Sequence, residues 1–244
     1  VALPLAVAAR APAPLHFLFH SAFCCSTLLV RALDRPGAAM GLSEPAILND
    51  IVGWRHRARP QPAEQTQVLA QALRLLARPW GPGEAVLVKP SNLLNPMAPA
   101  LLQLAPKARA ILLHAPLEDF LGSIARKGMW GRLWVRDLLV KLLREGAVQL
   151  GIEGEELLKL TDLQAAAVGW LAQQALFARL AGQMPERIRT LDSVELLARP
   201  AESVAAAALH YGLTIDADTA HQIAAGPAFT RNSKTGADFT ASDR

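Results

Sequence analysis

The chain has 244 residues, of which 52% are hydrophobic and 19% are charged, so it can bury a sizeable core and is not a disordered chain. Aromatic residues make up only 5%, and the abundance of Leu and Ala favours helices packed on a sheet over an all-β fold. The formal net charge of +4 is compatible with an anionic ligand but too small to indicate nucleic-acid binding.

The two ends of the chain differ in pattern from the part between them. We interpret "VALPLAVAARAPAP", residues 1–14, as a Pro/Ala-rich leader, with a signal-peptide remnant as the alternative. Residues 228–244 form a polar, aperiodic tail. No composition break divides residues 1–244, and no apolar run is long enough for a transmembrane helix, so we expect a single domain.

The first half of the chain alternates apolar runs with helical patterns. The run at residues 15–19 predicts a buried strand, and Ser26-Thr27 then begins the helical pattern "STLLVRAL". Residues 35–50 are punctuated by Pro and Gly, which predicts a loop carrying Glu44. A helix follows at 61–78 and a second buried strand at 85–90.

The remaining elements continue this alternation and then become mostly helical. Residues 92–106 predict a helix interrupted by Pro96 and Pro99, residues 110–114 a third strand, and residue 117 the start of another helix. Residues 187–192 are compatible with a last short strand. Buried strands that alternate with helices predict an α/β fold, with a parallel sheet between helical layers and a helical C-terminal half.

The loop between the first strand and the first helix is the first candidate for binding. The phosphate-loop frame G-x-x-x-x-G-K-S/T, laid on residues 20–27, matches only Thr27, which argues against a site that hydrolyses ATP or GTP. A helix start still offers free N–H groups and a positive dipole end to an anion, and Ser26 and Thr27 add hydroxyls. The alternative is that one of these hydroxyls only caps the helix.

Polar residues also follow each of the three predicted strands. Because ligands of open parallel sheets bind beyond the carboxyl ends of the strands, we expect these side chains to converge on one rim. They are His20, Ser21, Lys89, Ser91, Asn92, His114, Glu118, Asp119, Ser123 and Arg126.

Two other features bear on chemistry. Cys24 and Cys25 are adjacent and have no ligands at metal-binding spacing, so we expect no disulfide framework, no metal site and, by default, a reducing cytoplasm. Their position at a helix start could lower their pKa values, although close packing of small residues is the simpler interpretation. "WRHRARP", residues 54–60, is interpreted as a solvated loop, with contact to a ligand or acidic partner as the alternative.

An ordered series of motifs from residue 15 to residue 234 resembles the P-loop sulfotransferase family. "AFCCSTLLVRAL" is similar to its first strand-loop-helix signature, "SEPAILND" to its acidic segment, and "TRNSK" to its basic C-terminal segment. "RIRTLDSVELLARPAESVAAAALHYGL" is similar to its late helical segment. The longest match, residues 86–126, shows in family order Lys89, Pro90, Asn92, Pro106, Ala108, Arg109, Pro116 and Ser123.

The resemblance implies a donor, 3′-phosphoadenosine-5′-phosphosulfate, whose sulfuryl group passes to a hydroxyl or amine of a small-molecule acceptor without a metal. It implies that Glu44 or His20 serves as base, with Lys89 near the transferring group. The 3′-phosphate would be approached by His114, Ser123, Arg231 and Lys234. The 5′-phosphate would be held by Ser21, Ala22, Phe23, Cys24, Cys25, Ser26 and Thr27. Neither the acceptor nor the oligomeric state follows from the sequence.

Three positions depart from the family pattern. Phe23 stands at the basic position of the first loop, Cys25 at its glycine, and His114 at the arginine that grips the 3′-phosphate. Losing the charge at the leaving group should cost transition-state stabilisation unless His20, Lys89 or Arg126 replaces it. A non-catalytic relative that binds a nucleotide or phosphate is therefore the alternative, and a kinase-like phosphotransferase is a weaker one.

Overall fold

A computed structural model describes residues 12–147, 151 and 154–231 of the chain. Its centre is a sheet of five parallel strands in the order β2-β3-β1-β4-β5. In chain order these strands are β1 (Leu15–His20), β2 (Ala39–Ser43), β3 (Ala85–Lys89), β4 (Ala110–His114) and β5 (Ile188–Asp192). β1 lies between β3 and β4, so the strand order reverses around its carboxyl end.

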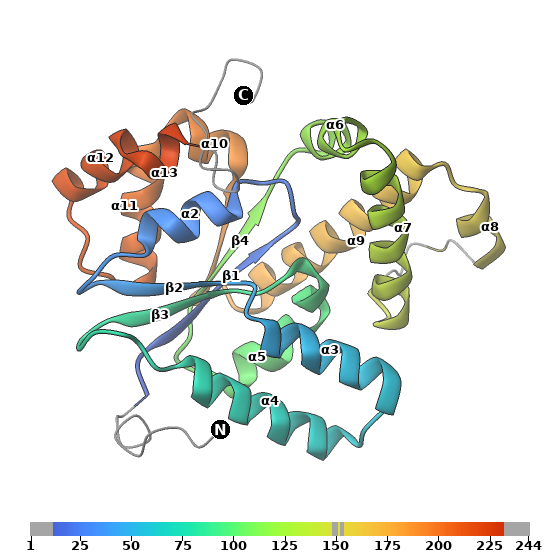
Figure 1. Ribbon diagram of the computed structural model, residues 1–244, viewed down its shortest axis with the longest axis horizontal. Helices are drawn as coiled ribbons and strands as arrows, with labels where there is room; N and C mark the ends of the chain where they lie inside the picture. Colours follow the sequence, from blue (N-terminus) through green and yellow to red (C-terminus); the bar gives the residue numbers. More distant parts are fainter. Residues whose placement is uncertain (1–11, 148–150, 152–153, 232–244) are drawn as a thin grey trace.

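Helices cover both faces of the sheet because its strands are apolar on both sides (Figure 1). Phe17 and Phe19 of β1 face one core, and Leu18 faces the other. The first core is closed by α3 (Ala46–Ala58), α4 (Pro62–Leu76), α5 (Ala98–Leu104) and the C-terminal part of α9 (Asp162–Gln183). The second is closed by α2 (Ser26–Leu33), α10 (Ser193–Ala198), α11 (Pro200–Tyr211) and α12 (Ala217–Ala225).

A further group of helices extends from the sheet beyond β4 (Figure 1). It comprises α6 (Leu117–Arg126), α7 (Gly128–Arg144), α8 (Gly154–Lys159) and the N-terminal part of α9. Gly128 has a φ of 58°, which lets the chain leave α6 and begin α7 within two residues. The 3₁₀ helix η1 (Asn92–Met97) connects β3 to α5.

The structure confirms the predicted α/β class, the strands at 15–19, 85–90, 110–114 and 187–192, and the helical C-terminal half. The loop predicted at 35–50 is wrong, because this segment contains edge strand β2 and the start of α3. This strand passes close to α2 at Gly41, where a Cβ would come within 2.9 Å of Val30 Cγ1. A glycine that signals a turn in the sequence is thus a point of close helix packing.

The ends of the described chain are partly tied to the fold. Before β1, the Ala13 N–H donates to Ala77 O and the Val86 N–H donates to Pro14 O. The segment predicted as a polar tail begins within the short helix α13 (Pro227–Thr230). None of the helices in the described ranges is long and apolar enough to cross a bilayer.

His16 on β1 generates a prediction about pH and stability. Burial, together with Arg109 and His210 nearby, lowers its pKa from 6.5 to about 4. The unfolded chain therefore takes up a proton first as the pH falls, so the free energy of unfolding should decrease by about 3 kcal/mol between pH 6.5 and pH 4 through this residue. Urea unfolding across this pH range should show a weaker decrease for H16N, which keeps an acceptor near the Arg109 N–H.

The exposed His221 provides the matched control, because H221N should retain the full pH dependence of the wild type. Equal pH dependence in H16N and the wild type would contradict the assignment to His16.

Candidate functional site

The first loop, residues 21–27, lies at the carboxyl end of β1, where the strand order reverses. Its start is fixed to the neighbouring strand, because the Ser21 N–H donates to Leu113 O at 3.1 Å. The Ser21 hydroxyl accepts a 3.4 Å bond from the Ala115 N–H. The loop therefore occupies the position at which open α/β sheets bind their ligands.

The backbone of this loop adopts the left-handed conformation without any glycine. Ala22, Phe23 and Cys25 have φ values of 71°, 50° and 61°. Each such conformation costs a residue with a Cβ about 1–2 kcal/mol. A left-handed residue beside a right-handed one, as Cys25 is beside the helical Ser26, forms the kind of backbone nest that binds anions.

Several N–H groups of the loop remain available for such an anion. α2 has no side-chain cap, and its first backbone bond runs from the Leu29 N–H to Cys25 O. The interpretation of Ser26 or Thr27 as a simple cap is therefore wrong. Within the described residues, no protein acceptor receives the N–H groups of residues 23–27. They lie at the positive end of the α2 dipole.

Three side chains of the loop are packed against other parts of the protein. Ser21 and Cys24 are fully buried, and the Cys24 thiol donates to Leu113 O. Phe23 packs edge-on against Phe120 and Trp134, with ring centroids 5.8 Å and 5.4 Å away. Any contact of residues 21–25 with a ligand is therefore made by backbone rather than by these side chains.

The aromatic contact of Phe23 continues toward the surface. Trp134 stacks on Trp130 at 6.2 Å, and Trp130 is 57% exposed. The rings of Phe23, Trp134 and Trp130 thus form a row of aromatic contacts from the first loop to the surface of α7.

The pKa values of the two cysteine thiols are raised, and not lowered as activation by the helix start would require. Burial, together with the neighbouring Cys25, raises the pKa of Cys24 to about 12. Burial and the nearby Asp119 carboxylate raise the pKa of Cys25. Both thiols therefore remain protonated near neutral pH, and packing describes them better than reactivity.

Lys89, Glu44 and His20 meet beside the loop, at the ends of three adjacent strands. Lys89 is 1% exposed, and its Nζ lies 2.5 Å from Glu44 Oε1 and 3.4 Å from His20 Nε2. Glu44 is held at a φ of 50°, and its N–H donates to Lys89 O. The Glu44 side chain is 47% exposed, so the carboxylate covers a buried ammonium on one side and faces solvent on the other.

The His20 ring connects this ion pair to the first loop. The Ala22 N–H donates to His20 Nδ1 at 3.1 Å, so we assign the ring proton to Nε2, which then donates to Pro90 O at 3.0 Å. Both ring nitrogens are engaged, and the residue is buried. An acceptor molecule can therefore reach the Glu44 carboxylate but not the His20 ring.

A buried amide network that the sequence analysis missed supports the start of the loop. Gln173 of α9 accepts from Asn92 at 3.3 Å and from Asn95 at 2.9 Å. Its own amide donates to Ser21 O and to Gly169 O. Asn95 also donates to His20 O at 2.9 Å. The one feature of the sequence that could have indicated this network is a glutamine, Gln173, within a strongly apolar helix.

The residues predicted to approach a 3′-phosphate are more dispersed. His114 Nδ1 lies 3.8 Å from Asp192 Oδ2 at the ends of β4 and β5. Ser123 on α6 accepts a bond from Arg126 at 3.2 Å, so the hydroxyl and the guanidinium lie together. Arg231 is exposed after α13, and Lys234 lies outside the described residues.

Metal ligands are not grouped in the described part of the chain. Among residues 12–147, 151 and 154–231, no three His, Cys, Asp or Glu side chains come close enough to hold an ion.

Comparison with known proteins identifies the fold. No family model matches the chain, and no curated protein matches it in sequence. Among solved structures, it is similar to a sulfotransferase domain from the curacin biosynthetic pathway, at 16% identity and a TM-score of 0.54, over 95% of this chain and 84% of that one. It is also similar to a sulfotransferase domain from the Synechococcus PCC 7002 olefin synthase, at 12% identity and a TM-score of 0.52, over 91% of this chain and 81% of that one. The chain therefore has a sulfotransferase-like fold.

The amide network leads to a prediction about stability. Q173L removes the partners of two asparagine amides and two backbone carbonyls, so it should lower the free energy of unfolding by about 3 kcal/mol. The adjacent Gln174 is the matched control, because its Nε2 is buried without a partner in the described structure. Urea unfolding should show Q174L to be neutral or stabilising; equal losses in both variants would contradict the network.

The thiols lead to a second prediction. At pH 8 a disulfide reagent should modify Cys24 and Cys25 in the folded protein at least about tenfold more slowly than in the unfolded chain, because burial keeps both protonated and covered. The rate in denaturant serves as the control. A thiol that reacts equally fast in the folded protein would contradict the raised pKa values.

Proposed function

We propose that this protein is a sulfotransferase-like enzyme that transfers a sulfuryl group from 3′-phosphoadenosine-5′-phosphosulfate to a hydroxyl or amine of a small acceptor. The observation that carries the proposal is the first loop. Ala22, Phe23 and Cys25 are left-handed although none is a glycine, and the N–H groups of residues 23–27 have no acceptor within the described residues, which supports binding of an anion there. The sulfotransferase-like fold of the whole chain supports the choice of donor.

The residues around the loop fit the phosphate groups of such a donor. The amides of residues 23–27 and the Thr27 hydroxyl offer donors for a 5′-phosphate at the dipole end of α2. Ser123 and Arg126, which are hydrogen-bonded to each other, offer a hydroxyl and a guanidinium for a 3′-phosphate. Arg126 is thus our candidate to replace the arginine that the family has at His114.

Burial favours Glu44 over His20 as the base. The carboxylate is half-exposed and reaches the rim, whereas both nitrogens of the buried imidazole already form hydrogen bonds. In the proposed reaction, the acceptor oxygen or nitrogen forms a bond to sulfur while the bond from sulfur to the phosphate oxygen breaks. Glu44 takes the proton that the acceptor loses, and adenosine 3′,5′-bisphosphate is released.

Lys89 acts on this site mainly through Glu44. As it lies, the ammonium is covered, and it orients the carboxylate through the 2.5 Å contact. The His20 ring alone separates it from the Ala22 amide. Its charge therefore lies close enough to the loop to stabilise negative charge on a leaving phosphate oxygen, a role that the uncharged Phe23 leaves open.

One observation favours the alternative of a non-catalytic relative that binds a nucleotide or phosphate. Phe23 is fixed in an aromatic cluster, so no cation reaches the bridging oxygen from the loop itself. Ligand binding alone does not separate the two functions, whereas sulfate transfer does.

The donor assignment predicts a difference between two nucleotides. Isothermal titration calorimetry should show binding of adenosine 3′,5′-bisphosphate and at least about tenfold weaker binding of ATP, because ATP lacks the 3′-phosphate and the chain lacks the phosphate-loop lysine. Absence of bisphosphate binding would refute the sulfotransferase proposal, and tighter binding of ATP would favour a phosphotransferase.

The assignment of the base predicts a loss of turnover without a loss of binding. With radiolabelled donor and a panel of phenols, sugars and amines, E44Q should lower kcat by about a hundredfold or more while bisphosphate affinity changes little. E186Q, at an exposed carboxylate near the opposite end of the sheet, is the control and should retain full activity. Full activity in E44Q would contradict the role of Glu44, and binding without transfer in the wild type would favour the non-catalytic alternative.

A further inference from the structure

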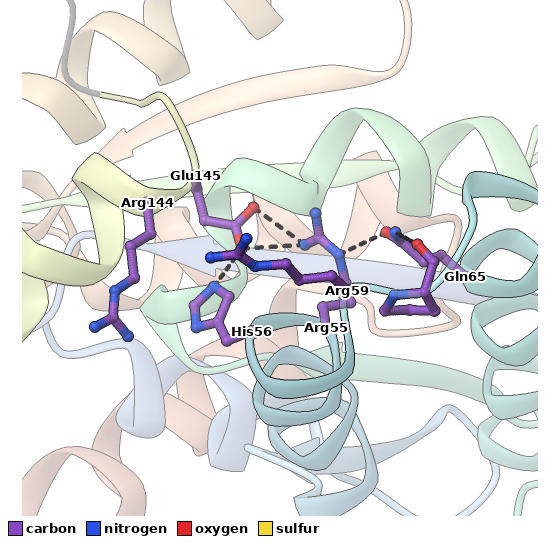
Figure 2. Close-up of a pocket in the computed structure, with 7 residues that line it drawn as sticks. Arg55, His56, Arg59, Gln65, Arg144 and Glu145 are labelled. Carbon is purple, nitrogen blue, oxygen red and sulfur yellow. Dashed lines mark hydrogen bonds and ion pairs between the residues drawn. The ribbon is translucent and has the colours of Figure 1, made fainter.

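A polar cavity of about 540 Å³ lies between the C-terminal ends of α3 and α7 and the start of α4 (Figure 2). Arg55, His56 and Arg59 approach it from α3, Arg144 and Glu145 from α7. The solvated loop predicted at residues 54–60 is wrong, because α3 continues to Ala58. The acidic partner considered as the alternative is a residue of this chain, Glu145.

One wall of the cavity is held in place by its own hydrogen bonds. The Arg55 Nε donates to Gln65 Oε1 at 2.8 Å, and its Nη1 lies 3.1 Å from one Glu145 oxygen and 3.2 Å from the other. His56 Nε2 lies 2.6 Å from Glu145 Oε1. The Glu145 side chain is only 9% exposed, so its charge is already compensated by Arg55 and His56.

The remaining positive charge of the cavity has no such compensation. In the described ranges 12–147 and 154–231, neither Arg59 nor Arg144 forms an ion pair. Both line the cavity from opposite helices and are exposed. With Glu145 neutralised by Arg55, the two guanidiniums give the cavity an excess of two positive charges before His56 is counted.

The dipoles of the two helices do not by themselves explain these arginines. Cations at helix ends commonly bond the last carbonyls. Here Arg55 bonds Gln65 and Glu145 instead, and no helix carbonyl of the described chain accepts from Arg59 or Arg144. Arg59 also stands in the left-handed C-cap position of α3, with φ 45° and ψ 52°, where glycine is favoured.

We propose that this cavity binds the phosphate group of a small phosphate monoester. Such a group carries about two negative charges, which the guanidiniums of Arg59 and Arg144 would balance, and its oxygens accept the paired N–H groups of arginine. A volume of about 540 Å³ also leaves room for the rest of a small ester. The compensated Glu145 keeps Arg55 and His56 oriented beside it.

The site is separate from the first loop. α3 begins two residues after Glu44, and its 13 residues extend for about 20 Å before the cavity is reached at its other end. The inference therefore goes beyond the proposed sulfuryl transfer and does not depend on it.

Isothermal titration calorimetry with inorganic phosphate, at constant ionic strength, tests the inference. The wild type should bind phosphate, and the double variant R59Q/R144Q should bind it at least tenfold more weakly, while the variant still binds adenosine 3′,5′-bisphosphate. The control R74Q/R179Q removes the same charge from exposed positions on α4 and α9 and should bind phosphate like the wild type. Succinate, a dianion with planar carboxylates, should bind more weakly than phosphate.

Three results would overturn the inference. They are no phosphate binding by the wild type, equal binding by R59Q/R144Q and the wild type, and an equal loss in R74Q/R179Q, which would show only a general effect of charge. Succinate binding as tight as phosphate would refute the choice of ligand. Loss of bisphosphate binding in R59Q/R144Q would refute the independence of the two sites.

Discussion

The site depends on the turn at residues 22–25. Its backbone adopts a left-handed conformation that glycine favours, although none of these residues is a glycine. Ala22, Phe23 and Cys25 each occupy the left-handed region, at a cost that the surrounding contacts must offset. Those contacts are the fully bonded Gln173 amide, the His20 ring under Ala22 and the aromatic cluster around Phe23. Without them the turn would relax from this conformation. The left-handed shape of this loop is thus maintained by packing rather than by glycine.

The second constraint is the burial of Lys89. An ammonium that is 1% exposed needs a counter-charge, and Glu44 is the only carboxylate in the described chain that forms an ion pair with it. This pair fixes the carboxylate at the rim beside the first loop. It also explains why β2 matters although it is short, since Glu44 follows its last residue and Ser43 lies in register with Lys89. The first loop and the Glu44 carboxylate are therefore placed side by side by the same three strands.

The sequence predicts most of the fold because β1, β3 and β4 are continuous apolar runs bounded by turn residues. It fails at β2, where "AMGLS" is short and its glycine serves helix packing. Within the site, strand ends predict that Lys89 and His20 lie near the same rim, whereas Glu44 was expected there only from the family resemblance. Gln173 and the partner of Arg55 could not be predicted, because both depend on how α9 and α7 pack against distant segments. The left-handed residues were hidden for a similar reason, since no glycine marks them.

The most direct measurement is the amide NMR spectrum of the protein titrated with adenosine 3′,5′-bisphosphate. The account predicts that the N–H signals of residues 23–27 move downfield with a common saturation curve, as charged oxygens accept them. Saturable binding that leaves the signals of residues 23–27 unchanged would contradict the claim that this turn holds the phosphate.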